Sequence, residues 1–232
     1  MTHQTLLDVD AYIFDVFGTV VDWRTSVARF VAPFLQDIDP LTFAEEWRAR
    51  YQPAMEGVRS GGRDYVALDD LHFEMLGDTL EHFGVAAEFD DATRWAMNRA
   101  WEHLDPWPDV LPGLKALRDR ALIAPCSNGS IALMSRLARY AHLPWHCVLG
   151  ADLARDYKPQ PQVYLACCHA LRLPVERVAM VAAHNDDLHA ARACGLKTVF
   201  IPRLTEHGPH QTTDLEPDSD WDGVIQDLSA LG

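Results

Sequence analysis

The stretch that decides the fold is Ala11-Tyr-Ile-Phe-Asp-Val-Phe-Gly-Thr-Val-Val-Asp22. Its first four residues form an apolar, β-favouring run that ends at Asp15, and Gly18 then breaks the strand. A carboxylate at the carboxyl end of a buried strand is costly unless it has partners or a function. The stretch therefore predicts a buried strand whose Asp15 is either a turn or helix-cap residue or a functional group.

Three further segments have the pattern of short buried strands, with helical patterns between them. Strands are expected over residues 122–127, 178–183 and 198–201. The intervening helices are expected over 130–142, 162–171 and 188–194. Strands that alternate with helices predict a parallel sheet with right-handed crossovers, so side chains at the strand ends gather at one edge. The fold class that follows is a Rossmann-like α/β core.

The long stretch from residue 23 to residue 103 contains helical patterns and no convincing strand. Helices are expected over 43–55, 65–83 and 91–103. A helical block between two strands of a sheet predicts a cap domain inserted above the strand ends. We therefore expect a core of residues 1–22 and 104–232 and a helical cap of residues 23–103. Residues 205–222 are expected to form a surface loop before a short last helix or strand.

Composition excludes several classes of function. The 232 residues are 48% hydrophobic and 23% charged, as in ordinary globular proteins, and the net charge of −14 disfavours nucleic acid as a partner. No apolar stretch approaches the roughly 18 residues of a membrane-spanning helix, so no membrane partner is expected. The start Met1–Thr5 does not resemble a secretory signal, and five cysteines are an odd number. We expect reduced thiols and a cytoplasmic protein.

Three more motifs carry residues with possible chemistry. Ser127-Asn128-Gly129 follows a predicted strand and precedes a helix, where free N–H groups suit an anion, although Asn-Gly is also an ordinary turn. Lys158 lies in Asp156-Tyr-Lys-Pro-Gln-Pro-Gln-Val-Tyr164, and a lone lysine is most often solvated. Asp187 lies in Val181-Ala-Ala-His-Asn-Asp-Asp-Leu188, where a helix cap is the alternative role.

Together, Asp15, Ser127, Lys158 and Asp187 resemble, in this order, the four motifs of the haloacid dehalogenase superfamily over nearly the whole chain. In that superfamily the first Asp is a nucleophile, and the Ser binds the acidic group of the substrate. The resemblance implies that Asp15, Lys158 and Asp187 are catalytic. A carboxylate nucleophile divides one difficult displacement into two easier steps, and a lysine beside it neutralises its charge.

Two positions depart from the phosphatases of that superfamily. Those phosphatases have an acid where Phe17 stands, which serves as general acid, and another where Ala183 stands, which binds magnesium. A phenyl ring cannot protonate a leaving oxygen, and alanine cannot bind a hard cation. Two losses in one predicted site indicate metal-free chemistry, so we expect neither a metal nor a cofactor.

The Phe17 variant and the spacing from Lys158 to Tyr164 resemble the type II 2-haloacid dehalogenases. In that group the Asp attacks C2 of an (S)-2-haloalkanoate and expels halide with inversion, and the ester is hydrolysed to a 2-hydroxy acid. The resemblance implies a small 2-halocarboxylate and halide as partners. Because the family is commonly dimeric, a homodimer is also expected.

Trp47-Arg48 matches a Trp-Arg pair of the family's cap, whose guanidinium accepts the departing halide. A cation held there stabilises the charge that develops on the halide in the transition state. The alternative is a solvated Arg48 paired with Glu45. The resemblance implies that the substrate-binding residues are Val16, Phe17, Thr19, Arg48, Ser127, Asn128, Tyr164, His184 and Asn185.

The fourth motif also differs from that of the best-known dehalogenases, which have Ser-Ser-Asn where Ala182-Ala183-His184 stands. This difference leaves open another electrophile, such as a strained ring, and another superfamily hydrolase, such as a phosphatase with altered metal ligation. A non-catalytic binding protein is a third alternative. Retention of Asp15 and Lys158 argues against it, because an inactive copy has no need of a buried charged pair.

Overall fold

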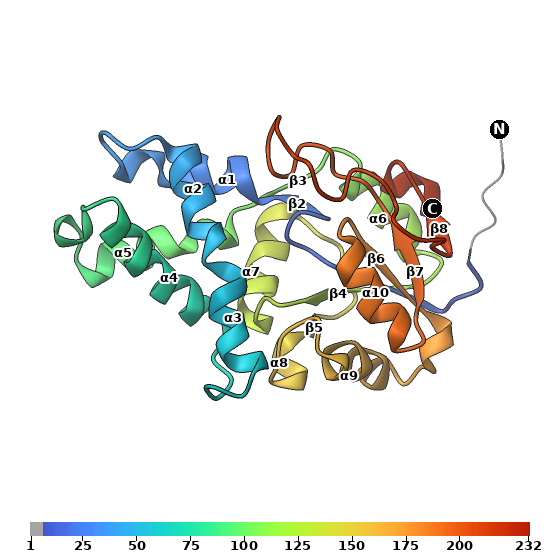
Figure 1. Cartoon of the computed structure of the whole chain (residues 1–232). Helices are drawn as coiled ribbons and strands as arrows, with labels where there is room; N and C mark the ends of the chain where they lie inside the picture. The colour runs from blue at the N-terminus through green and yellow to red at the C-terminus, as the bar shows by residue number, and fades with distance from the viewer. Residues whose placement is uncertain (1–6) are drawn as a thin grey trace.

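The computed structural model describes residues 7–232 of the chain (Figure 1). The start Met1–Thr5, for which no secretory signal is expected, lies outside the described residues. Within residues 7–232, no helix is both long enough and apolar enough to cross a membrane.

A six-stranded parallel sheet forms the centre of the core, with the strand order β5-β4-β1-β6-β7-β8. Ala11 of β1 lies opposite Leu122 of β4 on one side and Val178 of β6 on the other. This register brings the carboxyl ends of the three central strands to one edge. The strands of the sheet are β1 (Ala11–Phe14), β4 (Leu122–Ser127), β5 (Leu149–Gly150), β6 (Val178–Ala182), β7 (Lys197–Phe200) and β8 (Gly223–Val224).

Helices cover both faces of this sheet because side chains of a strand point alternately to opposite faces. Tyr12 and Phe14 belong to one apolar cluster, and Ala11 and Ile13 belong to the other. The first cluster includes residues of α6 (Val110–Arg118) and α7 (Ile131–Ala141). The second includes residues of α9 (Pro161–Leu171) and α10 (Asn185–Ala193), and the short helix α8 (Ala151–Ala154) precedes them. Both faces are therefore buried, as the continuous apolar strands predict.

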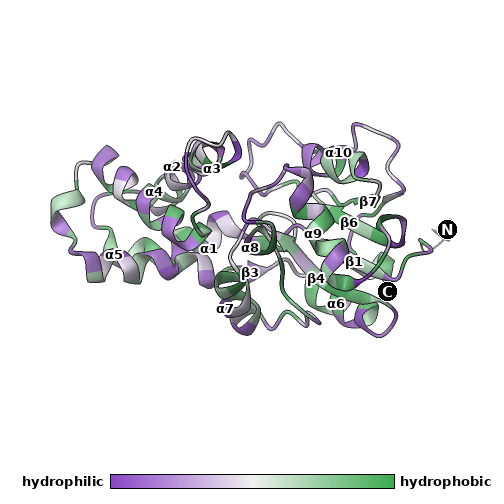
Figure 2. Cartoon of the chain, turned by 90° about the horizontal axis from the view of Figure 1, so that it is seen from below, coloured by the Kyte–Doolittle hydropathy of each residue, from purple (hydrophilic) through white to green (hydrophobic). Residues whose placement is uncertain are grey.

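The helical insertion lies between β2 (Val21–Asp22) and β3 (Asp105–Pro106), which pair antiparallel. Figures 1 and 2 show α2, α4 and α5 as a group to one side of the sheet. In Figure 2 the apolar residues of the core concentrate on the strands between the helices. The helices of the insertion are α1 (Trp23–Val31), α2 (Pro40–Ala49), α3 (Tyr51–Arg59), α4 (Leu68–His82) and α5 (Asp91–Asn98). A helical cap insertion on an α/β core is thus confirmed, while its residue limits stay a prediction.

The four predicted strands are confirmed to within one residue at each end, and the three core helices to within three. The single helix expected over 43–55 is wrong, since α2 ends and α3 begins around Arg50. Pro53 explains the break, because proline has no N–H to donate to the carbonyl of Ala49 in a continuous helix. The pattern over 91–103 divides into α5 and a 3₁₀ helix, Arg99–Glu102.

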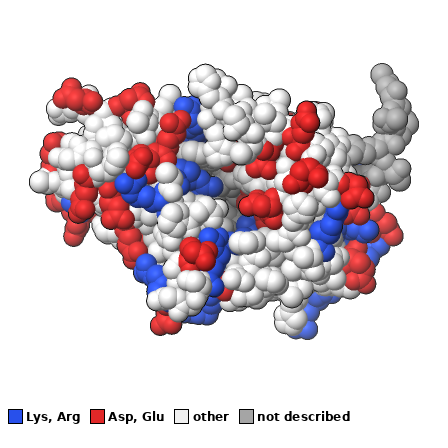
Figure 3. Space-filling model, in the orientation of Figure 1, with Lys and Arg blue, Asp and Glu red and all other residues white. Residues whose placement is uncertain are grey.

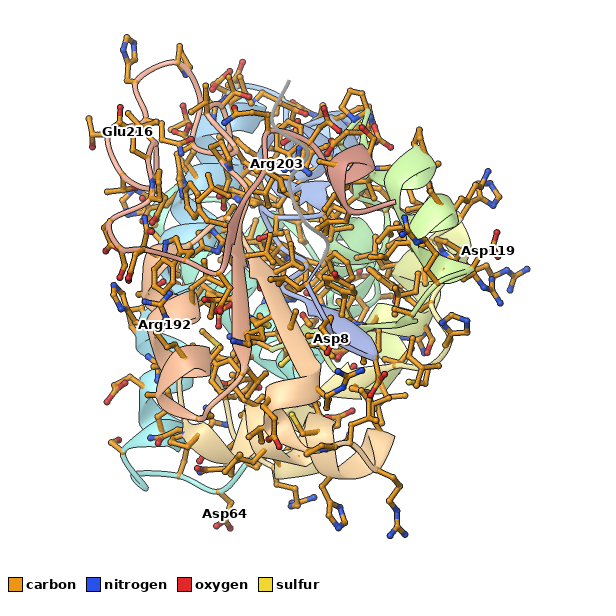
Figure 4. The ribbon with its side chains drawn as sticks, turned by 90° about the vertical axis from the view of Figure 1, so that its right-hand side faces the viewer. Asp8, Asp64, Asp119, Arg192, Arg203 and Glu216 are labelled. Atoms are coloured by element: carbon orange, nitrogen blue, oxygen red, sulfur yellow. The ribbon has the colours of Figure 1, made fainter. Side chains whose placement is uncertain are left out.

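The predicted loop over 205–222 has no helix or strand and passes from β7 to β8 (Figure 1). Before it, the guanidinium of Arg203 donates to both carboxylate oxygens of Asp109, at 2.8 and 3.0 Å, and to the carbonyl of Thr19. Figure 4 shows Arg203 within the fold, whereas Glu216 lies at the outer edge of the loop. Arg203 thus attaches the chain before the loop to the start of α6 through Asp109 and to the turn that follows β1 through Thr19.

Candidate active site

The strand ends border a cavity of about 1430 Å³. Figure 3 shows a hollow between the helical insertion and the core, with both acidic and basic residues around it. Its lining includes Asp15 from the end of β1, Lys158 from the loop before α9, and Asp187 from the first turn of α10. Arg48 of α2 lines it from the insertion. The predicted catalytic residues therefore lie in one cavity between core and insertion.

Asp15 is buried, and neighbouring donors hold both of its carboxylate oxygens. Thr19 donates its hydroxyl to Oδ2 at 2.8 Å, and Lys158 donates its ammonium to Oδ1 at 2.8 Å. His184 Nδ1 lies 3.2 Å from Oδ2. Burial alone raises the pKa of Asp15, but Lys158 and His184 outweigh burial and lower it. The carboxylate is thus ionised and oriented at the cavity wall.

Lys158 bridges Asp15 and Asp187, whose Oδ2 lies 2.5 Å from the ammonium. Tyr164 donates its hydroxyl to the other oxygen of Asp187 at 2.5 Å. Burial opposes the charge on Lys158, but the two carboxylates prevail and raise its pKa well above the ordinary value. Burial raises the pKa of Asp187. This arrangement fixes a permanent cation beside Asp15.

His184 connects Asp15 to an acid that the sequence analysis did not identify. Its Nε2 lies 2.9 Å from Oε2 of Glu206, which is 2% exposed. Trp23 donates its indole N–H to Oε1 of Glu206 at 3.0 Å. Burial lowers the pKa of His184, but Glu206 and Asp15 outweigh burial and raise it well above the ordinary value. A line of three groups thus runs from Asp15 through His184 to Glu206.

Gly18 makes room for this line. A Cβ on Gly18 would lie 2.1 Å from Oε1 of Glu206, and its φ of +90° disfavours any other residue. The sequence signal for Glu206 is absent, because it lies in a loop 183 residues from Trp23, its hydrogen-bond partner. Only the folded chain brings it to the cavity.

Phe17 contributes an aromatic wall and is 2% exposed. It contacts Trp101, His72 and Tyr51 edge to face, with ring centroids 5.8, 6.2 and 6.4 Å away. The acid of the phosphatases is thus replaced by a phenyl ring that packs against aromatic side chains of the insertion. No carboxylate takes over its position among these contacts.

Arg48 faces these aromatic side chains and is not paired with Glu45, which instead binds Arg24 at 2.6 Å. The guanidinium carbon of Arg48 lies 3.8 Å from the ring centroid of Tyr51 and 5.4 Å from that of Trp23. Within residues 7–232, its buried Nη1 has no hydrogen-bond partner. The guanidinium is therefore positioned by aromatic faces and has an N–H group available for an anion.

The other predicted residues are divided between the cavity and its supports. Asn128 lines the cavity, and its Oδ1 accepts the N–H of Lys158 at 2.8 Å. Ser127 is fully buried at the end of β4, and its hydroxyl accepts the N–H of Gly129. Thr19 also accepts the N–H of Ala183 at 2.8 Å, so its hydroxyl links two strand ends. These contacts support the lysine and the nucleophile.

Asn185 lines the cavity, whereas Val16 does not belong to its lining. Val16 is fully buried directly after Asp15. The amide of Asn185 donates to Asp214 and to the carbonyl of Glu216, and its Oδ1 accepts the indole N–H of Trp221. The Asn185 side chain thus fastens the loop of residues 205–222 at the start of α10.

A second cavity of about 870 Å³ lies between α4, α5 and α7. His72 and Trp101 line it, and their rings stack with centroids 4.3 Å apart. Burial lowers the pKa of His72 well below the ordinary value. Among residues 7–232, four buried atoms without hydrogen-bond partners belong to residues of this lining: Asp69 Oδ2, His72 Nε2, Asn98 Oδ1 and Trp101 Nε1.

Comparison with known proteins identifies the family. A family model described as haloacid dehalogenase-like hydrolase matches residues 9–195. The defluorinating L-2-haloacid dehalogenase Rha0230 is 46% identical, with a TM-score of 0.94 over 96% of this chain and 93% of that chain. The L-2-haloacid dehalogenase PA0810 is 45% identical, with a TM-score of 0.92 over 96% and 97%.

A curated relative agrees with these structures. (S)-2-haloacid dehalogenase 1 of Pseudomonas sp. (strain CBS-3) is 28% identical over 205 residues, which are 85% of this chain and 86% of the relative. The matches extend over core and insertion alike. The chain therefore belongs to the haloacid dehalogenase-like hydrolase family, among its L-2-haloacid dehalogenases.

Proposed function

We propose that this protein hydrolyses short (S)-2-haloalkanoates to 2-hydroxy acids through a covalent ester on Asp15, without a metal ion. The observation that carries the proposal is the position of Asp15, ionised and held by Lys158, in the same cavity as Arg48. Phe17, where phosphatases have an acid, supports displacement at carbon over phosphate chemistry. The identity to L-2-haloacid dehalogenases supports the same substrate class.

In the first step, an oxygen of the Asp15 carboxylate attacks C2 of the substrate. A C–O bond forms, and the electron pair of the carbon–halogen bond leaves with the halide. Arg48 supplies a guanidinium whose Nη1 has no acceptor among residues 7–232, so it can bind the departing halide. We propose that Asn128, Ser127 and the backbone N–H groups of Val16 and Phe17 hold the substrate carboxylate.

In the second step, water attacks the ester carbon of Asp15, and the bond from that carbon to the substrate oxygen breaks. Esterification removes the negative charge of Asp15, so His184 is then held by Glu206 alone. We propose that His184 passes its Nε2 proton to Glu206 once Asp15 is neutral, so that Nδ1 accepts the proton of the water and then returns it to the departing oxygen of the product. Lys158 stabilises the charge that develops on the carbonyl oxygen.

The proposal also covers the halogen that the enzyme removes, its location in the cell, its oligomeric state and the residue limits of its cap. Because one relative is described as defluorinating, fluoroacetate belongs among the substrates to test. A cytoplasmic location is supported by five cysteines that are all free thiols. A homodimer follows from the family resemblance, and light scattering after size-exclusion chromatography tests it. We also propose that residues 23–103 form the cap and that residues 1–22 and 104–232 form the core. A chain in which residue 22 is joined directly to residue 104 should therefore fold without the cap.

The test of the activity is halide release from (S)-2-chloropropionate, (R)-2-chloropropionate, chloroacetate and fluoroacetate, each with EDTA present. We expect release from the (S) form and from chloroacetate, undiminished by EDTA. Release that requires added magnesium would contradict the metal-free reaction. Release from none of the four would indicate a hydrolase for another electrophile, such as a strained ring.

A further inference from the structure

Three side chains that can bind metal ions meet at one wall of the larger cavity. His184 precedes α10, and Glu206 and His207 lie in the segment after β7; their ligand atoms all lie within 4.8 Å of one another. His184 Nε2 is 2.9 Å from Glu206 Oε2, and His207 Nε2 is 3.6 Å from Glu206 Oε1. Tetrahedral zinc bonds of about 2.0–2.1 Å place neighbouring ligand atoms about 3.3 Å apart. Small shifts therefore suffice for one ion.

The surroundings of the two buried ligands support this arrangement independently. Asp15 Oδ2 lies 3.2 Å from His184 Nδ1, so its carboxylate can hold the Nδ1 proton and leave Nε2 for an ion. Trp23 donates to Oε1 of Glu206 at 3.0 Å and fixes that carboxylate. Carboxylates behind histidine ligands and donors behind carboxylate ligands are the usual outer partners of metal sites.

The site is also accessible. His184, Glu206 and His207 all line the cavity of about 1430 Å³. The side chain of His207 is 43% exposed, whereas that of Glu206 is 2% exposed. An ion can thus enter from the cavity, and its remaining coordination positions face the space that a substrate would occupy.

We propose that His184, Glu206 and His207 form a site for a first-row divalent cation, represented by zinc, and that the bound ion inhibits the enzyme. Two imidazole nitrogens and one carboxylate suit zinc better than magnesium. The ion occupies the Nε2 lone pair of His184, so the imidazole no longer relays a proton between water and Glu206. The site uses neither Phe17 nor Ala183, the two positions at which the phosphatases have acids. The binding part stands without the proposed function, and the inhibition part rests on it.

The binding test is calorimetric titration of the full chain with zinc chloride after treatment with EDTA and its removal. We expect one zinc ion per chain in the wild type and a Kd at least 10-fold weaker in His207→Gln. The matched control is His210→Gln, since His210 is an exposed histidine of the same loop, three residues further on. We expect it to bind as the wild type does. Equal binding by wild type and His207→Gln, or no binding by the wild type, would overturn the site.

The inhibition test compares halide release with and without zinc for each variant, relative to that variant's own rate in EDTA. We expect zinc to inhibit the wild type and His210→Gln at least 10-fold near saturation, with recovery on addition of EDTA. His207→Gln should be inhibited much less at the same zinc concentration. Stoichiometric binding without inhibition would overturn the inhibitory role alone. Absence of halide release in EDTA would contradict the proposed function and leave the calorimetric result standing.

Discussion

The two walls of the cavity differ in whether their buried polar groups have hydrogen-bond partners. On the core wall, Asp15, Lys158 and Asp187 are buried and joined by hydrogen bonds of 2.5–2.8 Å. On the side of the insertion, Arg48 Nη1 is buried with no partner within residues 7–232. Unpaired buried polar groups are costly, and charged ones more so. The polar groups of the core wall are thus paired without a ligand, while Arg48 of the insertion has an unpaired donor that a ligand can satisfy.

We infer from this difference that the core and the insertion have separate roles in the reaction. A nucleophile must be ionised and oriented before the substrate arrives, which the paired core wall provides. A leaving group needs donors that act only as its charge develops, and Arg48 can provide them. Variants of each wall should therefore fail in different ways.

The largest effect is expected for the nucleophile. Asp15→Asn should lower kcat by at least about 10³-fold, because an amide oxygen cannot form the ester intermediate. Halide release measures the loss, and circular dichroism should show a folded protein. Asp10→Asn, at the exposed residue just before the same strand, is the matched control and should keep its activity. Substantial activity in Asp15→Asn would contradict a covalent mechanism.

The next effect concerns the insertion. Arg48→Met should lower kcat by about 10²–10³-fold, since the charge on the departing halide loses its cation. Arg50→Met is a suitable control, because Arg50 lies two residues after Arg48 and pairs with Glu46. Steady-state kinetics with chloro and bromo substrates measure both. Similar losses in the two variants would show that Arg48 has no special position.

His184 should act in the second step only. His184→Gln should slow ester hydrolysis by about 10²-fold, because the proton acceptor for water is lost. Rapid-quench measurements should then show a burst of halide equal to the enzyme present, followed by slow turnover. Mass spectrometry of the quenched protein should find the ester on Asp15. Loss of the burst itself would place His184 in the first step instead.

A pair outside the cavity tests the core's reliance on paired charges. Burial raises the pKa of Asp109, but its bonds to Arg203 and Leu228 outweigh burial and lower it. A lowered folded pKa stabilises the protein above the unfolded value of about 3.9, and this stability is lost as pH falls through the folded pKa. Asp109→Asn should cost about 1–3 kcal/mol at pH 7 in urea unfolding. The difference from the wild type should shrink below about pH 4, and a constant difference would contradict the pair.

The smallest effect concerns an unpartnered group of the insertion. His72→Phe keeps a ring against Trp101 and removes a buried nitrogen without a partner, so stability should change by less than about 1 kcal/mol or rise. Thr79→Val, in the same helix, removes a hydroxyl that donates to Met75 at 2.7 Å and should be destabilising. Thermal unfolding compares the two. A larger loss in His72→Phe would reveal a partner for His72.

The sequence was sufficient for those parts of the site that depend on local pattern. Asp15 and Asp187 follow apolar runs that form strands, and parallel pairing brings such ends together. Glu206 and His207 could not be predicted, because they lie in a loop without periodicity and reach the cavity only through contacts with Trp23 and His184. The position of Arg48 was implied by resemblance, whereas its aromatic surroundings required the fold.

The most direct test of the central claim is a single turnover in H₂¹⁸O with the enzyme in excess over (S)-2-chloropropionate. If water attacks the ester carbon of Asp15, the hydroxyl oxygen of the product comes from the carboxylate. We therefore predict that ¹⁸O appears in the peptide containing Asp15 and is absent from the 2-hydroxypropionate. Product that carries ¹⁸O from the first turnover would mean that water attacks C2 directly, and it would contradict the ester mechanism.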